Sequence, residues 1–177
     1  MNEKKIEQAI YNLLVAIGED PNREGLVETP KRVAKMYKEL LTCNNFNYTT
    51  FQDNFDDIVM VRDIEFTSMC EHHLLPFYGI AHIAYIPNGK IIGLSKLARV
   101  VEKYARKLQV QERMTNDIYN ELKDKLNTED IAIYIEAKHM CMIARGIKKE
   151  LSNTVTVKLN GVFKNKRTYD FYKLINK

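Results

Sequence analysis

The chain has 177 residues, 45% hydrophobic and 28% charged, a composition typical of a soluble globular protein long enough to bury a core. The net charge of +4 suits anionic small molecules, and no dense basic run interleaved with aromatic residues argues for nucleic acid. Three cysteines cannot form a disulfide framework. The charges of the N-terminus lie too close to its apolar residues for a signal peptide, and no apolar run is long enough for a membrane span. We therefore expect a cytoplasmic protein without a membrane partner.

The N-terminal part of the chain has helical periodicity. Apolar residues recur at helical spacing over 6–17, and Gly18 is placed to end this helix. The stretch "ETPKRVAKMYKELL" predicts a second helix, with Thr29 as N-cap and Pro30 at the first helical position. The asparagine-rich stretch 42–54 has neither helical nor strand periodicity and predicts a linker.

The periodicity changes to that of strands from about Val59. The stretches "VMVRDIEFTSM" and "GIAHIAYIP" read as strands, and "PNGK" predicts a hairpin turn into "IIGL". Ser95 is placed to cap a helix, and a later helix has apolar residues at steps of four: Met114, Ile118, Leu122 and Leu126. "IAIYIEAKH" and "NTVTVKLNGVF" again alternate as strands.

This order of elements predicts an α+β fold, with antiparallel strand pairs and two helices on one face of a single sheet. We place an N-terminal helical segment and linker at residues 1–50 and the α+β domain at 51–177. The N-terminal segment shows no second core.

The stretch "CEHHLLPF" concentrates metal-binding and acid–base residues beside an apolar run. Cys70 and His73 have the C-x-x-H spacing with which a short turn supplies two zinc ligands. That spacing alone favours a core cysteine and a hydrogen-bonded histidine over a metal site. A second pair, His139 and Cys141, in a chain with four histidines favours a metal site. Three ligands would leave a tetrahedral zinc ion one open position, as in catalytic sites.

The remaining cysteine and histidine fall outside this pattern. Cys43 lies in the linker, away from any histidine or second cysteine, and we interpret it as an unpaired thiol. His82 alternates along a strand and reads as a sheet or surface histidine.

A second group of residues suits an anionic ligand. Ser95, Lys96 and Arg99 lie in the first turns of a predicted helix, where free backbone N–H groups already favour negative charge. Arg145 closely follows Cys141. Beside a metal site these residues suggest a bound phosphate ester. Glu112 is either a solvated loop carboxylate or an acceptor for the donors of guanine, and the sequence does not choose between the two.

Four blocks of the sequence resemble the signature blocks of GTP cyclohydrolase I. They are "ETPKRVAKMY", "CEHHLLPFYGIAHIAYIP", "GLSKLARVVEKYARKLQVQERMT" and "EAKHMCMIARGIKK", in the family's order and spacing. The resemblance implies the tunnelling fold, in which the sheets of five subunits close into a barrel and two rings stack as a homodecamer.

The resemblance also implies a role for each candidate site residue. Cys70, His73 and Cys141 match zinc ligands, and His72 and His139 match acid–base histidines, with Ser95 near the ribose. Gln111 and Glu112 match the guanine site, and the triphosphate ligands are Lys96, Arg99 and Arg145, with Arg32 supplied by an adjacent subunit.

The activity implied by the resemblance is zinc-dependent hydrolysis of the guanine imidazole ring of GTP. Formate leaves, and rearrangement gives 7,8-dihydroneopterin triphosphate for folate or tetrahydrobiopterin synthesis. One alternative is a related deazaguanine nitrile reductase, which uses a cysteine nucleophile and a nicotinamide cofactor without this triad. Another is a catalytically silent, zinc-stabilised protein that senses purine nucleotides.

Overall fold

The computed structural model describes residues 1–176, which form two compact units divided between Thr42 and Cys43. Within those residues, no helix is both long and apolar enough to span a bilayer.

The first unit is a pair of helices in contact, α1 (Glu3–Ala16) and α2 (Thr29–Leu40). Both helices were predicted, but the prediction of Thr29 as N-cap is wrong. The N-cap is Glu28, whose backbone is already in the α region, and the Thr29 N–H donates to the carbonyl of Leu26 at 2.9 Å. The preceding turn thus starts the helix one residue early, which makes Pro30 its second residue.

The second unit is built on a five-stranded sheet in the order β5-β2-β3-β6-β7. All neighbouring strands are antiparallel except the short β5, which runs parallel to β2. This arrangement confirms the two predicted strand pairs and joins them through β3 and β6. The strands are β2 (Val59–Cys70), β3 (Pro76–Tyr85), β5 (Leu108–Gln109), β6 (Ile131–His139) and β7 (Thr154–Leu159).

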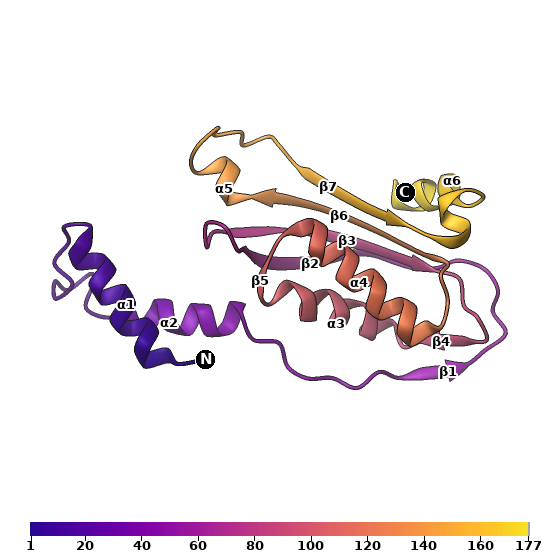
Figure 1. Cartoon of the computed structure of the whole chain (residues 1–177), viewed down its shortest axis with the longest axis horizontal. Helices are drawn as coiled ribbons and strands as arrows, with labels where there is room; N and C mark the ends of the chain where they lie inside the picture. The colour runs from indigo at the N-terminus through magenta and orange to yellow at the C-terminus, as the bar shows by residue number, and fades with distance from the viewer. Residues whose placement is uncertain (177) are drawn as a thin grey trace. The chain divides into compact units, whose positions relative to one another are not determined.

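Two helices, α3 (Leu94–Ala105) and α4 (Gln111–Leu126), lie on the same side of this sheet (Figure 1). The four residues predicted at steps of four are all fully buried, because that face of α4 packs against the sheet. The prediction of an α+β fold with two helices on one face is therefore confirmed.

The opposite face of the sheet is covered at one end by a C-terminal segment that the sequence pattern did not reveal. β7 ends at Leu159, so the strand predicted to continue through Phe163 is too long. The chain instead forms the 3-10 helix η1 (Gly161–Lys164) and then α6 (Thr168–Ile175). Their buried Phe163 and Phe171 pack against Ala84 and Ala132, which are paired in β3 and β6.

The predicted hairpin after β3 is wrong. β4 (Lys90–Ile92) turns away from β3 and pairs with β1 (Thr50–Gln52), which the linker contributes. The Ile92 N–H donates to the Tyr85 hydroxyl at 3.2 Å, and this buried bond helps to hold β4 in its separate sheet.

The start of α3 also differs from the prediction. The N-cap is Gly93, whose N–H donates to the Thr49 carbonyl at 2.9 Å, and Ser95 is the second helical residue without a capping bond. The pairing of β4 with the linker thus fixes the chain at Gly93, two residues before Ser95.

Gly79 allows β3 and β6 to approach closely near the end of the sheet that bears the histidines. A Cβ atom at this position would lie 1.9 Å from the backbone oxygen of Glu136. Since backbone cannot yield as a flexible side chain does, any larger residue here would push the two strands apart. Two residues away, Phe77 pairs with His139 in the same ladder.

Candidate active site

A tight turn between β2 and β3 carries the first two predicted metal ligands. The Cys70 N–H donates to the Leu75 carbonyl and the Leu74 N–H donates to the Cys70 carbonyl, both at 2.9 Å. Leu74 adopts a positive φ of 53° to close the turn. The turn places Cys70 at the end of β2 and His73 within the loop.

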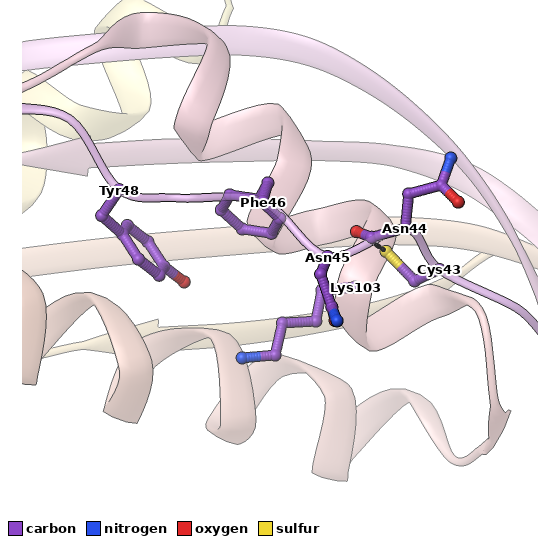
Figure 2. Close-up of a pocket in the computed structure, with 6 residues that line it drawn as sticks. All are labelled: Cys43, Asn44, Asn45, Phe46, Tyr48 and Lys103. Atoms are coloured by element: carbon purple, nitrogen blue, oxygen red, sulfur yellow. Dashed lines mark hydrogen bonds between the residues drawn. The ribbon is translucent and has the colours of Figure 1, made fainter.

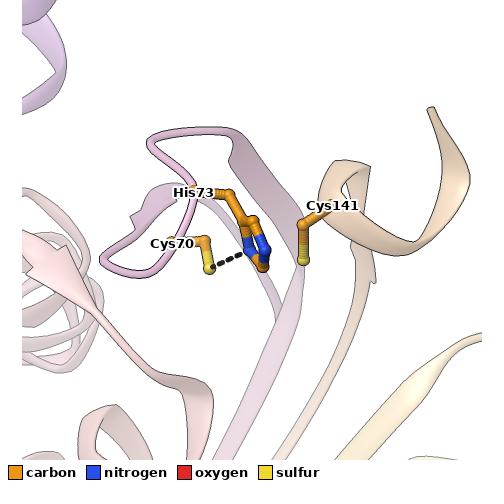
Figure 3. Close-up of side chains that lie close together, drawn as sticks. All are labelled: Cys70, His73 and Cys141. Carbon is orange, nitrogen blue, oxygen red and sulfur yellow. Dashed lines mark hydrogen bonds between the residues drawn. The ribbon is translucent and has the colours of Figure 1, made fainter. Parts of the chain in front are cut away.

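The third ligand arrives from a distant part of the chain. The antiparallel register pairs Phe77 with His139, so the end of β6 lies beside the start of β3. Directly after β6 the short helix α5 (Met140–Ile143) turns Cys141 toward the loop. Figure 3 shows the Cys141 side chain reaching this loop from α5.

The ligand atoms of Cys70, His73 and Cys141 all lie within 4.8 Å of one another. Cys70 is buried, and its Sγ lies 3.9 Å from Nδ1 of His73. No other group of three histidine, cysteine or acidic residues in 1–176 is gathered in this way. Two sulfurs and one imidazole nitrogen suit a borderline-soft ion such as zinc, so the residues present fit a metal centre.

The charge balance of this cluster favours a cation. Burial and the neighbouring Cys70 sulfur raise the pKa of the Cys141 thiol, and the positive charge of Arg145 partly opposes this rise. Without a cation the Cys141 sulfur therefore resists becoming a thiolate, whereas a bound metal would favour its deprotonation. Arg145 is exposed just after α5, and its charge is close enough to influence the Cys141 thiol.

His139 occupies a restrained position beside the cluster. Its ring stacks on Phe77, and its Nε2 lies 2.8 Å from Oε1 of Gln111, the first residue of α4. Burial lowers the pKa of the His139 imidazole, and the carboxylate of Glu112 opposes that shift. Glu112 is exposed, and its carboxylate lies near enough to His139 to act on that pKa.

The second acid–base candidate, His72, is exposed on the loop itself. Its Nδ1 lies 3.9 Å from the Cys70 sulfur, and its Nε2 lies 3.9 Å from a carboxylate oxygen of Glu71. Glu71 in turn accepts two hydrogen bonds from Arg113, at 2.6 and 2.9 Å. The bidentate Glu71–Arg113 ion pair joins the loop between β2 and β3 to the first turn of α4, which carries Gln111 and Glu112.

Three predicted anion ligands lie away from this cluster within the same chain. Ser68, two residues before Cys70, donates to the carbonyl of Ala105 at 2.6 Å, so the last turn of α3 lies at the cluster end of the sheet. The first turn of α3, with Ser95 and Lys96, lies at the other end of the helix, close to β4 (Figure 1). Arg99 is exposed one turn further along.

The remaining triphosphate candidate, Arg32, belongs to the first unit. It is exposed on α2.

Comparison with known proteins identifies the family of this chain. The family model described as GTP cyclohydrolase I matches residues 6–176. This chain belongs to the GTP cyclohydrolase I family.

Curated members of the GTP cyclohydrolase I family are similar over nearly their full length. GTP cyclohydrolase 1 of Clostridium kluyveri is 53% identical over 171 residues, which cover 94% of this chain and 92% of the relative. The Streptococcus thermophilus enzyme of the same name is 51% identical over 172 residues, with 94% and 92% covered. That of Bacillus subtilis is 52% identical over 171 residues, with 93% and 90% covered.

Cys43 and His82, to which the sequence analysis gave no functional role, lie outside the metal cluster. Cys43 lines a small pocket with Lys103 and the linker residues up to Tyr48, and its thiol donates to the Asn44 carbonyl at 3.4 Å (Figure 2). His82 is a buried sheet histidine whose Nδ1 accepts the N–H of Asp63 at 3.3 Å.

Sequence reasoning missed three residues that shape the site. Phe77, Glu71 and Arg113 all occur in the quoted family blocks, but none was given a role. Their contacts depend on the β3–β6 register and on where α4 begins, and a single sequence carries no signal for either.

Proposed function

We propose that this chain converts GTP into formate and 7,8-dihydroneopterin triphosphate by hydrolysis of the guanine imidazole ring. The observation that carries this proposal is the Cys70–His73–Cys141 cluster beside a restrained His139, in a chain of the GTP cyclohydrolase I family.

The cluster residues would hold the zinc ion. A zinc ion bound by Cys70, His73 and Cys141 would lower the pKa of water to about 7 and so supply hydroxide at neutral pH. Three ligands are typical of a catalytic zinc site and four of a structural one, which supports a chemical role for this cluster.

His139 would supply the proton for the first step. Carbon 8 of guanine belongs to an electron-rich ring and is a poor electrophile until N7 is protonated. An imidazole suits this transfer because its pKa lies near neutral pH. Once N7 carries the proton, hydroxide can add at C8 and the imidazole ring opens.

His72 is placed to act in the steps that follow. A second hydrolysis releases formate, and the ribose carbons then rearrange and close the pteridine ring. These steps also move protons, and His72 is an exposed imidazole next to Cys70.

Glu112 would select guanine. Its exposed carboxylate near His139 can accept hydrogen bonds from the ring N–H and the exocyclic amine of guanine. Adenine presents a different pattern of donors and acceptors at this edge, so it would leave the carboxylate without matching donors.

The triphosphate site would be shared between subunits of a homo-oligomer. Ser95, Lys96 and Arg99 lie in the first turns of α3, whereas the last turn of this helix is the one near the metal cluster. Their distance from the cluster of their own chain supports a role in the active site of another subunit. Arg145 would join them from the chain that carries the cluster, and Arg32 from an adjacent subunit. A decamer of two stacked pentamers, with sheets closed into a barrel, would provide such neighbours. The cytoplasmic location remains a prediction from composition.

The test is to incubate the purified zinc-loaded protein with GTP and to measure formate and the fluorescence of the oxidised pterin. We expect both products in equal amounts from GTP and neither from ATP. Zinc and GTP binding without formate would identify a silent nucleotide sensor. Oxidation of a nicotinamide cofactor on a deazaguanine nitrile would identify the reductase alternative.

A further inference from the structure

Gln111 lies at the junction of three elements next to His139. It is the first residue of α4 and only 1% exposed. Its Nε2 donates to the carbonyls of Ile135 and Thr154, at 3.1 and 3.0 Å, and to the Thr156 hydroxyl at 3.1 Å. The side chain is thus held by β6 and β7 as well as by its own helix.

These partners fix the orientation of the Gln111 amide. Backbone carbonyls can only accept hydrogen bonds, so the amide end that faces Ile135 and Thr154 must be the NH₂ group. The reverse orientation would bury two carbonyls against an oxygen without a hydrogen between them. Oε1 is therefore the atom that lies 2.8 Å from Nε2 of His139.

The fixed amide determines where His139 carries its proton. An oxygen acceptor requires a donor, so Nε2 of His139 must bear hydrogen in the neutral as well as the charged ring. The parallel Phe77 ring, with centroids 4.6 Å apart, restrains the tilt of the imidazole at the same time. The remaining ring nitrogen, Nδ1, is then the one that is not committed to Gln111.

We propose that Gln111 is a positioning residue that holds His139 in the Nε2–H tautomer, so that Nδ1 is the atom that delivers the proton to the substrate. This inference rests on the proposed role of His139 as general acid. It differs from the guanine contact that the family resemblance implies for Gln111. The amide N–H groups are already shared among three acceptors, so they have none left for a base.

The kinetic test compares two substitutions of similar size. Gln111→Met removes the acceptor, whereas Gln111→Glu keeps an oxygen opposite Nε2 of His139 and, as a protonated carboxyl, can still donate to one of the two facing carbonyls. We expect Gln111→Met to lower kcat roughly 10²-fold at unchanged KM for GTP and unchanged zinc content, because a His139 ring that Gln111 no longer orients does not present its Nδ1–H to the substrate. Gln111→Glu should retain at least tenfold more of the rate, roughly, than Gln111→Met.

Gln109 offers a matched control. It is a fully buried glutamine two residues away, whose amide contacts the Tyr104 carbonyl and the Val110 N–H but not His139. Gln109→Met should lower the melting temperature without a comparable loss of kcat. An equal loss of kcat in Gln109→Met, or a raised KM at unchanged kcat in Gln111→Met, would overturn the proposal.

A spectroscopic measurement separates this inference from the proposed function. Nitrogen-15 spectra of the zinc-loaded protein labelled at histidine, with His139→Ala as the blank, report which ring nitrogen of His139 carries hydrogen. We expect a protonated Nε2 and an unprotonated Nδ1 in the neutral ring, and a loss of this preference in Gln111→Met. The opposite tautomer in the wild-type protein would refute the positioning role, even if the protein hydrolyses GTP. Conversely, wild-type activity in His139→Ala would refute the acid role while the tautomer assignment could still hold.

Discussion

The ring of Phe77 lies parallel to the imidazole of His139, with 4.6 Å between the centroids and 2° between the planes. The two residues are direct partners in the β3–β6 ladder. We predict that Phe77→Leu lowers kcat about tenfold, since a smaller and branched side chain no longer holds the imidazole flat. The free energy of unfolding should fall by roughly 1–2 kcal/mol from the lost packing. Steady-state kinetics and thermal unfolding of the same preparation measure both effects.

Phe66 provides the control for this substitution. It is also buried and meets Phe77 edge-on, with centroids 6.0 Å apart. Phe66→Leu should destabilise the protein to a similar extent while kcat changes little. If both variants lose the same activity, the effect comes from general loosening of the core and not from the stack on His139.

The two partly buried cysteines distinguish a ligand from a bystander. We expect Cys141→Ala to lose zinc and activity but to keep its fold, because Cys141 is only partly buried at the margin of the core and a catalytic ion need not hold the fold together. Cys43→Ala should keep zinc and activity, because this thiol lies outside the metal cluster and donates to the neighbouring Asn44 carbonyl. Metal analysis after gel filtration measures the zinc content of each variant, and circular dichroism shows whether the fold is kept. Stoichiometric zinc in the Cys141 variant would remove this residue from the ligand set.

Periodicity predicted the elements that are buried along one face. The step of four in α4 and the alternation in β3 and β6 follow from packing against a single core, so a local pattern was enough to find them. The prediction of a hairpin after β3 was wrong because β4 is held elsewhere. The N–H groups of Ile92 and Gly93 donate to the Tyr85 hydroxyl and the Thr49 carbonyl, and the sequence of the turn does not indicate either hydrogen bond.

The candidate site was predictable in part for a similar reason. C-x-x-H spacing is local, so Cys70 and His73 could be predicted from the sequence as two ligands of one metal ion. Cys141 and His139 needed the second cysteine–histidine pair and the family blocks. The orientation of the Gln111 amide could not be predicted, because its partners lie on two strands that the chain reaches more than twenty residues later.

Complementation tests the composite site. Cys70→Ala and Lys96→Ala should each be nearly inactive alone, because one lacks the metal cluster and the other a phosphate ligand. Co-assembly of the two chains would join an intact cluster with an intact Lys96 at roughly a quarter of the sites if mixing is random. Differently tagged chains verify that mixed oligomers form. Mixed oligomers without any gain in activity would place Lys96 outside the neighbour's site.

Stability should depend on pH through His82. Burial lowers the pKa of this imidazole, with Asp63 and Glu136 opposing the shift and Arg62 adding to it. The unfolded chain then binds a proton near pH 6.5 while the folded chain does not, so the free energy of unfolding should fall as the pH drops below about 6.5. Above that pH both states are neutral at this residue and its contribution is constant.

His82→Asn isolates this effect, because the Asn Oδ1 can accept the Asp63 N–H in place of the imidazole Nδ1. We expect a flatter dependence of the melting temperature on pH between about 7 and 5 in this variant than in the wild type. Equal slopes for the two proteins would show that His82 does not titrate differently on folding.

Release of carbon 8 as formate tests the central claim most directly. The wild-type protein and His139→Ala are loaded with equal zinc and given GTP labelled at C8. The wild type should transfer the label to formate in step with pterin formation, and His139→Ala should bind GTP and retain zinc but release label roughly 10²- to 10⁴-fold more slowly. Label that stays in the nucleotide with the wild-type protein, or leaves at the same rate in both proteins, would contradict the account.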